Sequence, residues 1–98
     1  SDPFRVTEAD GLTLASLNGL PAVEAFEEHA EAMGETLDRA APIPFFLQNI
    51  IGIDTGNGFR LRVPLMINDD GSIQCAAEVP VGSVVRISLI WSSETLSG

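Results

Sequence analysis

Three alternating runs in the C-terminal half constrain the fold of this chain more than any other feature. They span residues 59–67, 72–79 and 83–91, and in each run an apolar residue occupies every second position. Because side chains on a strand alternate between the two faces of a sheet, each run predicts a strand with one apolar face. Residues 68–71 and 80–82, which separate the runs, are of types typical of turns. The pattern predicts an antiparallel meander with one dry face and one solvent-facing face.

The N-terminal segment predicts a β-hairpin over residues 4–17. Two short alternating runs are separated there by Asp10 and Gly11. An Asp-Gly pair between alternating runs is a strong local signal for a hairpin turn.

An amphipathic helix is predicted to follow the hairpin. Pro21 suits the first helical turn, where its missing N–H costs nothing, and Gly34 is expected to cap or interrupt the helix near its end. The apolar stripe at helical spacing consists of Val23, Phe26, Ala30, Met33 and Leu37. We expect this stripe to cover the dry face of the meander.

Pro42 and Pro44 end the helical pattern, and residues 45–53 predict another strand, with a turn at 54–58 before the first of the three runs. The order is therefore β-β-α-β-β-β-β. This order predicts an α+β fold, an antiparallel sheet with one amphipathic helix packed on one face. Residues 1–98 are expected to form a single domain, itself a fragment of a larger protein, with 92–98 as a tail or linker.

Composition argues against several classes of partner. The net charge is −9, with five arginines and no lysine. A field of that sign repels phosphate backbones and anionic headgroups, so we expect neither nucleic acid nor membrane as a partner. No apolar run approaches the roughly 20 residues that cross a bilayer. The single cysteine, Cys75, cannot form an internal disulfide, which fits a reducing, cytoplasmic compartment.

No residue pattern indicates catalysis, a metal site or a cofactor. The sequence has no glycine-rich phosphate loop and no metal-ligand spacing of histidine and cysteine. His29 falls at the flank of the helical stripe and is interpreted as a half-buried structural residue. Cys75 lies on the dry face, where a thiol keeps a high pKa. Asp69 and Asp70 precede a glycine, and ordinary turn chemistry is favoured over a calcium loop.

Arg60, Arg62 and Arg86 are the candidate binding residues. Alternation places each of them opposite the apolar positions of its strand. Their guanidinium groups could receive an anionic ligand or a partner carboxylate in bidentate geometry. The alternative, which we favour, is cross-strand pairing with Glu78 and Glu8 on a solvated face.

Six segments in colinear order over residues 4–90 resemble one known family. They include Leu17-Asn-Gly-Leu-Pro-Ala22 at the helix start and Val79-Pro-Val-Gly-Ser-Val-Val-Arg86 near the end. The other segments lie at residues 4–9, 46–54, 62–67 and 69–73. Together they are similar to the FIST C-terminal domain, named for F-box and intracellular signal transduction proteins.

The resemblance implies a non-catalytic sensory module that binds a small ligand, an amino acid or other small carboxylate. It also implies an N-terminal FIST domain and a signalling output domain as partners in the parent protein. Some relatives resemble haem-based sensors. His29 is the only histidine in this sequence that could bind a haem iron, and we do not extend haem binding to this chain. The alternative is a protein-interaction or dimerisation module, forming for example a homodimer, within a signalling or ubiquitin-ligase protein.

Overall fold

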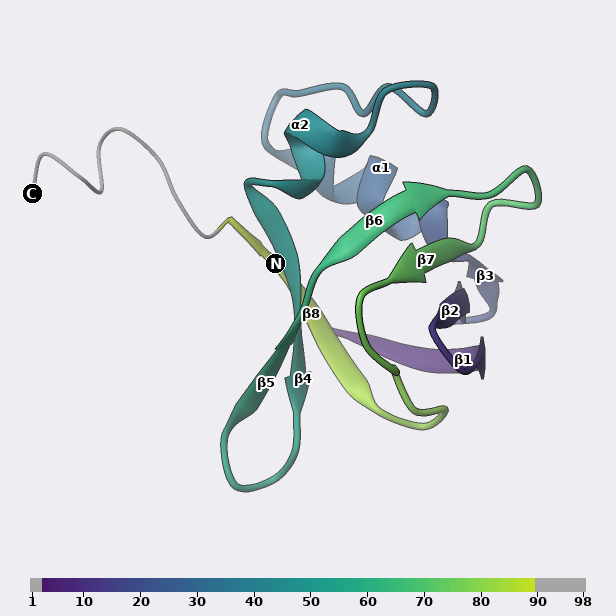
Figure 1. The fold of residues 1–98 in the computed structure, drawn as a ribbon. Coiled ribbons are helices and arrows are strands. Elements are labelled where there is room, and N and C mark those ends of the chain that lie inside the picture. Colours follow the sequence, from purple (N-terminus) through teal and green to yellow (C-terminus); the bar gives the residue numbers. More distant parts are fainter. Residues whose placement is uncertain (1–2, 90–98) are drawn as a thin grey trace, which may run out of the picture.

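The computed structural model describes residues 3–89, which form an antiparallel sheet with two helices at one end (Figure 1). The predicted tail at 92–98 and the last two residues of the run 83–91 lie outside the described residues. The elements are β1 (Phe4–Asp10), β2 (Thr13–Leu17), β3 (Leu20–Pro21), α1 (Ala22–Ala32), α2 (Ile43–Phe46), β4 (Asn49–Asp54), β5 (Phe59–Arg62), β6 (Pro64–Ile67), β7 (Ile73–Cys75) and β8 (Val84–Leu89).

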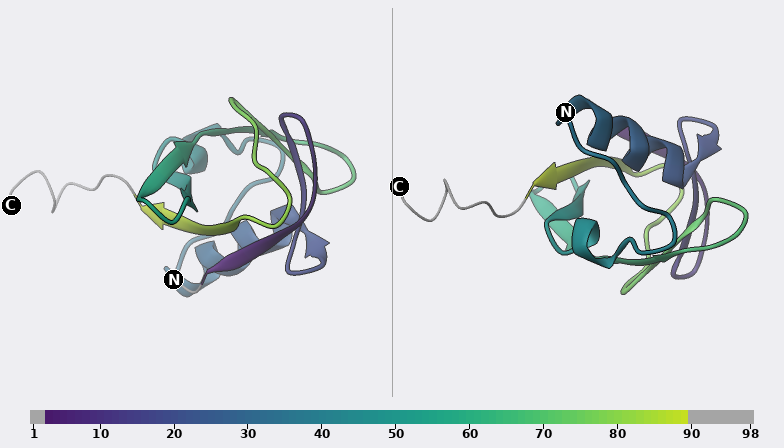
Figure 2. Two further views of the ribbon diagram at one scale, coloured as in Figure 1. Left: turned by 90° about the horizontal axis from the view of Figure 1, so that it is seen from below. Right: turned by 90° about the horizontal axis from the view of Figure 1, so that it is seen from above.

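The sheet confirms the predicted α+β class. Its strands follow the order β5-β4-β8-β1-β2-β7-β6, β3 pairs with β2, and every pairing is antiparallel. The two strands at the ends of this order, β5 and β6, are neighbours in sequence, separated by Val63 alone. The sheet therefore curls round until its two ends meet at residue 63, as the end-on views show (Figure 2).

The N-terminal hairpin is confirmed. β1 pairs with β2, and the register places Asp10 opposite Thr13 and Ala9 opposite Leu14. Gly11 has a φ of 58°, a left-handed conformation that glycine adopts without steric cost. Two register shifts lie farther back along the hairpin, between Val6 and Ala9.

The predicted meander of the C-terminal runs is confirmed for its first pair and wrong for its second. The run 72–79 contains only the short strand β7, which pairs with β6 as expected and also with β2, whereas β8 pairs with β4 and β1. Residues 76–83 carry the chain across from one part of the sheet to the other, and Val79 is buried on the way. The prediction failed for the second pair because it took strands that are adjacent in sequence to be adjacent in the sheet.

The predicted dry face of residues 59–67 is also wrong. The run breaks at Val63 into β5 and β6, and four of its five alternating apolar residues are exposed: Phe59 by 62%, Leu61 by 63%, Val63 by 41% and Leu65 by 42%. The fifth, Ile67, is half-buried and packs against the core. Alternation separates two faces of a strand but does not say which of them is buried. That choice follows from the register, which places Arg60 opposite the buried Ile53.

Helix α1 buries the apolar stripe as predicted, with Val23, Phe26 and Ala30 at most 1% exposed. The surface it covers differs from the prediction, because its main strand contacts are with β2 and β3 and not with the C-terminal runs. The helix ends before Gly34, whose φ of 76° fits a helix-terminating glycine, and Leu37 is buried in the loop beyond the end of the helix.

The strand predicted over 45–53 begins later than expected. Residues 43–46 form the short helix α2, and β4 begins at Asn49. Pro44 lies in the first turn of α2, where a proline is tolerated because that N–H has no helical partner. The rings of Phe26 and Phe46 meet edge to face at 5.4 Å, which joins α2 to α1.

Candidate functional site

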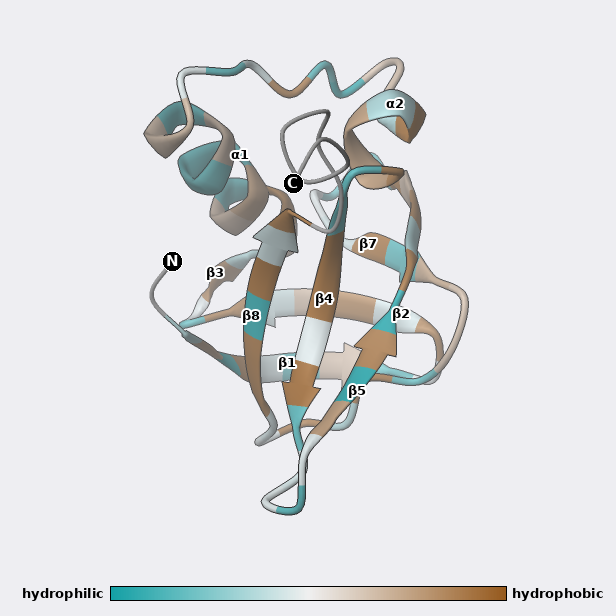
Figure 3. Cartoon of the chain, turned by 90° about the vertical axis from the view of Figure 1, so that its left-hand side faces the viewer, coloured by the Kyte–Doolittle hydropathy of each residue, from teal (hydrophilic) through white to brown (hydrophobic). Residues whose placement is uncertain are grey.

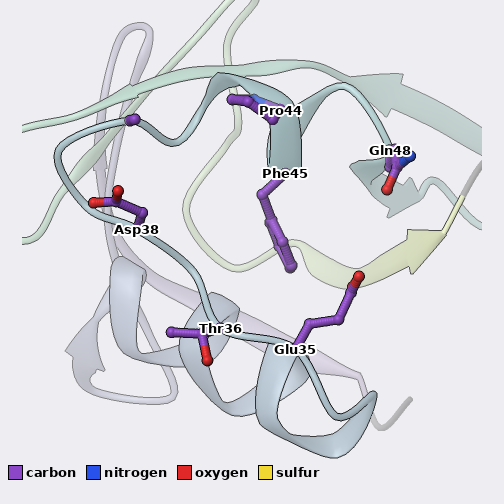
Figure 4. Close-up of a pocket in the computed structure, with 7 residues that line it drawn as sticks. Glu35, Thr36, Asp38, Pro44, Phe45 and Gln48 are labelled. Atoms are coloured by element: carbon purple, nitrogen blue, oxygen red, sulfur yellow. The ribbon is translucent and has the colours of Figure 1, made fainter.

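Helices α1 and α2 both lie at the end of the sheet where β4 begins (Figure 3). A cavity of about 310 Å³ lies between the loop that follows α1 and helix α2 (Figure 4). Two carboxylates, a hydroxyl, an amide and an aromatic ring contribute to its lining. The lining residues are Glu35, Thr36, Asp38, Ala41, Pro44, Phe45 and Gln48.

The chain after α1 forms one wall of the cavity. Gly34 turns the chain out of the helix, and the amide of Glu35 donates to the carbonyl oxygen of Ala30 at 2.8 Å. Asp38 folds the loop further, because its Oδ1 accepts a hydrogen bond from the amide of Ala40 at 2.9 Å. Glu35 and Asp38 are thereby placed on the same cavity (Figure 4).

Helix α2 forms the opposite wall. Its turn is closed by backbone hydrogen bonds from Phe46 to Pro42 and from Leu47 to Ile43, each of 2.9 Å. The ring of Phe45 points into the space between the two walls (Figure 4). The side chain of Glu35 extends toward this ring from the other wall, whereas the carboxylate of Asp38 is directed away from it (Figure 4).

A buried hydrogen-bond chain anchors Phe45 from behind. The side-chain Nδ2 of Asn49 donates to the carbonyl oxygen of Phe45 at 3.0 Å, and Asn49 Oδ1 lies 2.9 Å from His29 Nε2. Because Oδ1 can only accept, His29 carries a proton on Nε2 in this arrangement. The rings of His29 and Phe45 also meet edge to face, at 6.3 Å. His29 was predicted to be half-buried; it is 8% exposed and structural, tying α1 to the start of β4.

The surroundings of the cavity are acidic. A second cavity, of about 320 Å³, shares Glu35 and Thr36 with the first and adds Glu27, Glu31 and Leu37. Arg39 forms a bidentate ion pair with Glu27, with both contacts at 2.8 Å, and its hydrogen bond lowers the pKa of that carboxyl. Among the described residues no basic side chain pairs with Glu35 or Asp38. The site therefore attracts cationic groups.

The three candidate arginines do not form one cluster. The register places Arg60 opposite Ile53 and Arg62 opposite Ile51, so their side chains share the face of the buried isoleucines. Arg86 lies opposite Gly52, on the other face of the same strands. None of the three arginines lines the cavity. Arg60 pairs with Ile53, which lies four positions along β4 from Asn49 at the cavity end of the strand, a distance of about 13 Å along the strand.

Arg62 has a structural contact in this fold. Its Nε donates to the carbonyl oxygen of Glu78 at 2.6 Å, and its Nη1 donates to the carbonyl oxygen of Leu61 at 3.0 Å. Arg62 therefore reaches Glu78, as the pairing interpretation proposed, but through the main chain and not through the carboxylate. These bonds tie β5 to the segment that leaves β7.

Cys75 and Asp70 fit their structural interpretations. Cys75 is fully buried, and burial raises the pKa of its thiol to about 11, which keeps it protonated and unreactive at neutral pH. Asp70 accepts hydrogen bonds from the amide and the hydroxyl of Ser72, at 2.9 and 2.6 Å, and the hydroxyl bond lowers the pKa of its carboxyl. Within residues 3–89 no group of histidine, cysteine and carboxylate side chains could hold a metal ion.

The sequence prediction missed the cavity entirely. Glu35, Asp38 and Phe45 come together only because the loop 33–42 folds back and α2 packs on α1. One signal was available in the sequence. The pair Pro42 and Pro44 fits a helix start as well as a strand approach, and it would have placed Phe45 on a helix.

Comparison with known proteins identifies the family. The family model of the FIST C domain matches residues 22–97, which is more than half of the chain. Searches of curated proteins and of solved structures gave no match. No helix among the described residues is long and apolar enough to cross a membrane. The matched range includes both helices and all strands from β4 to β8. The chain therefore belongs to the FIST C domain family, whose domains are associated with signal transduction.

Proposed function

We propose that this chain is a non-catalytic sensory module that binds a small ligand carrying an ammonium group, such as an amino acid, in the cavity between the loop after α1 and helix α2. The observation that carries the proposal is the side chain of Glu35 extending toward the ring of Phe45 in one cavity, whose lining also includes Asp38. An ammonium group between a carboxylate and an aromatic face gains both ionic and cation–π attraction. The volume of about 310 Å³ is at the small end of ligand sites, which suits a molecule of amino-acid size.

Polar groups at the edge of the cavity can bind the remainder of an amino acid. The hydroxyl of Thr36 and the side-chain amide of Gln48 are both able to donate hydrogen bonds to a ligand carboxylate. This arrangement assigns the ammonium group to the acidic wall. It leaves Arg60, Arg62 and Arg86 as a separate, untested prediction for carboxylate binding.

We assign the polar groups of the lining to binding and not to turnover. Among the described residues that line the cavity there is no histidine, cysteine or serine, and the two carboxylates, the hydroxyl and the amide are the groups that would contact the ligand. The protonated thiol of Cys75 is buried elsewhere. We further propose a cytoplasmic setting, in which an N-terminal FIST domain and an output domain of the same protein receive the signal.

The signal has a physical route from the cavity into the sheet. Phe45 lines the cavity, its carbonyl oxygen is held by Asn49, and Asn49 is the first residue of β4. A ligand that moves Phe45 therefore changes the hydrogen bonding at the start of β4, which pairs with β8 along its whole length. The change is thereby passed from β4 to β8.

Calorimetric titration of the 98-residue chain tests the proposal. The natural amino acids are screened first, and the tightest binder is compared with its decarboxylated amine and its deaminated acid. We expect the amine to retain most of the affinity and the acid to lose it. No heat from any amino acid or amine, or equal affinity for the amine and the acid, overturns the proposal.

Matched variants locate the binding. Glu35→Gln is expected to weaken binding about tenfold, since a charge-assisted bond is lost, and Asp38→Asn is expected to weaken it less, since it removes a neighbouring charge and no direct bond. Asn at position 38 keeps an oxygen for the amide of Ala40, so the loop is preserved. Glu28→Gln on the exposed side of α1 removes the same charge outside both cavities and should change affinity less than twofold. The pair Arg60→Ala and Arg62→Ala should leave the affinity for the amino acid unchanged, since neither arginine lines the cavity.

A further inference from the structure

A row of exposed apolar side chains runs along β5 and into β6. Phe59 and Leu61 are more than 60% exposed, and Val63 and Leu65 are each more than 40% exposed. Alternation along β5 places Phe59 and Leu61 on the same, outer side, and Val63 and Leu65 follow beyond the break between β5 and β6. Four large apolar residues in one continuous row are typical of an interaction surface.

The outer edge of β5 is open over a short stretch. The amide of Thr55 donates to the carbonyl oxygen of Gly58 at 3.0 Å, so residues 55 and 58 form a hydrogen-bonded pair in the β4–β5 hairpin. Because such pairs alternate in an antiparallel ladder, Arg60 and Arg62 also bond to β4. The N–H and C=O groups of Phe59 and Leu61 therefore point away from β4.

Neighbouring contacts define where this open edge ends. The carbonyl oxygen of Leu61 accepts the Nη1 bond of Arg62 on that outer side. The carbonyl oxygen of Val63 accepts a hydrogen bond from the amide of Ala76, so the edge is covered from residue 63 onward. The open part, residues 59–61, lies on a hairpin that projects from the rest of the fold (Figure 1).

The positive charge of Arg60 on this edge favours a partner strand with an acidic side chain. Arg60 lies between the two outward-facing apolar residues and is exposed. In a strand added beside β5, the residue opposite Arg60 would share its face, and the residues opposite Phe59 and Leu61 would share the apolar face. An acidic residue flanked by apolar residues complements this order.

A second copy of this chain fits poorly. Two β5 strands pairing antiparallel about a two-fold axis keep their faces aligned, because the axis is perpendicular to the sheet. Arg60 and Arg62 of one copy would then lie opposite the arginines of the other. Like charges in directly opposed positions destabilise a strand pair.

We propose that the open edge of β5 binds an extended segment of another protein in which apolar and acidic side chains alternate. The segment adds a strand beside residues 59–61. Its apolar side chains pack on Phe59 and Leu61, and its carboxylate pairs with Arg60. This surface is separate from the cavity beside α2. Peptide binding at β5 is therefore independent of whether the cavity binds a small ligand.

Nuclear magnetic resonance titration of the 98-residue chain provides the test. The probe is the synthetic peptide Gly-Ser-Val-Glu-Val-Glu-Val-Ser-Gly, and the comparison peptide has lysine in place of both glutamates. The glutamate peptide is expected to shift the amide signals of residues 59–61 and to bind at least about fivefold more tightly than the lysine peptide, as opposed cross-strand charges require. Arg60→Glu should reverse that preference.

Changes to the backbone hydrogen-bonding groups distinguish strand addition from nonspecific hydrophobic binding. Leu61→Pro removes an outward N–H without removing a bond to β4, and it should abolish binding. A peptide methylated on its valine nitrogens tests the same bonds with the protein unchanged, and it should also fail to bind. Leu12→Ser, at another exposed leucine in the β1–β2 turn, should leave binding unaffected. Equal binding of both charged peptides, or undiminished binding of the methylated peptide, overturns the proposal. So does a dimer that Leu61→Pro dissociates, because the partner would then be a second copy.

Discussion

The backbone amide of Val23 donates a hydrogen bond of 2.9 Å to the carbonyl oxygen of Gly71. This bond joins the first turn of α1 to the turn between β6 and β7. No side-chain oxygen caps the helix, since Pro21 occupies the N-cap position, so the carbonyl of Gly71 satisfies an N–H that would otherwise lack a partner. The helix is thus held at its start by a residue far along the chain.

Gly71→Ala is expected to lower the free energy of unfolding by about 2–4 kcal/mol. Gly71 has a φ of 87°, and a Cβ there would lie 2.9 Å from Pro21 Cβ and 3.2 Å from Val23 Cγ1. Both the backbone conformation and the close approach therefore oppose a side chain. Urea denaturation followed by circular dichroism measures the loss.

Gly56→Ala is the matched control for this substitution. Gly56 has nearly the same φ, 85°, but nothing lies within 4 Å of its Cβ position. Only the conformational cost applies, about 1–2 kcal/mol. Equal losses for the two variants would show that the contact with α1 contributes nothing.

Asn49→Ala is expected to cost about 2–4 kcal/mol of stability. Asn49 is fully buried, and its removal takes away the partner of the His29 Nε2–H and one of the two hydrogen bonds to the carbonyl oxygen of Phe45, which keeps its bond from the amide of Gln48. Thermal or urea unfolding measures the effect. Asn57→Ala in the exposed β4–β5 turn should change stability by no more than about 0.5 kcal/mol.

A double-mutant cycle tests whether His29 and Asn49 act as a pair. His29→Ala should be less costly in the Asn49→Ala background than alone, with a coupling energy of about 0.5–3 kcal/mol. Additive losses would mean that the 2.9 Å contact between the two side chains does not stabilise the fold.

Local patterns predicted the parts of the fold that local interactions determine. The Asp10–Gly11 turn and the helix end before Gly34 depend on the conformations of a few neighbouring residues, and both are confirmed. The buried face of β5 depends instead on its register with β4, which no alternation within residues 59–67 specifies. Its apolar row was therefore assigned to the wrong side.

The candidate site was less predictable than the fold because it is assembled over long sequence separations. Phe45 meets the loop after α1 only because Phe46 packs on Phe26 and Asn49 bonds to His29. Those contacts join residues about twenty positions apart. Arg60, Arg62 and Arg86 were grouped by alternation alone, and the register then separated Arg86 from the other two.

Arg62→Ala is expected to lower stability by about 1–2 kcal/mol, since hydrogen bonds from a charged group to two main-chain carbonyls are lost. Hydrogen exchange should also quicken at the amide of Ala76, whose bond to Val63 lies at the same junction. Arg60→Ala on the same strand is the control and should change stability by no more than about 0.5 kcal/mol. Similar losses of stability for the two substitutions would mean that the main-chain hydrogen bonds of Arg62 do not stabilise the fold.

The stability of the domain is expected to fall as the pH rises from about 9 to about 11. The thiol of Cys75 has a pKa of about 11 in the folded protein, raised from 9.0 by burial. In that interval the folded state retains a proton that the unfolded state loses, so rising pH favours unfolding. The difference of about two pH units corresponds to about 3 kcal/mol, fully present below pH 9 and lost above pH 11.

The sequence makes this pH interval unusually easy to interpret, because the chain has no lysine and no tyrosine. Cys75 is then the only side chain expected to change its charge between pH 9 and 11. Urea unfolding at pH 8 and pH 10.5 should show a loss in the unsubstituted protein that Cys75→Ala largely removes, whatever the absolute stability of that variant. The same decline in both proteins would mean that the folded state exposes the thiol to solvent, against its burial beside Ile73 in the core.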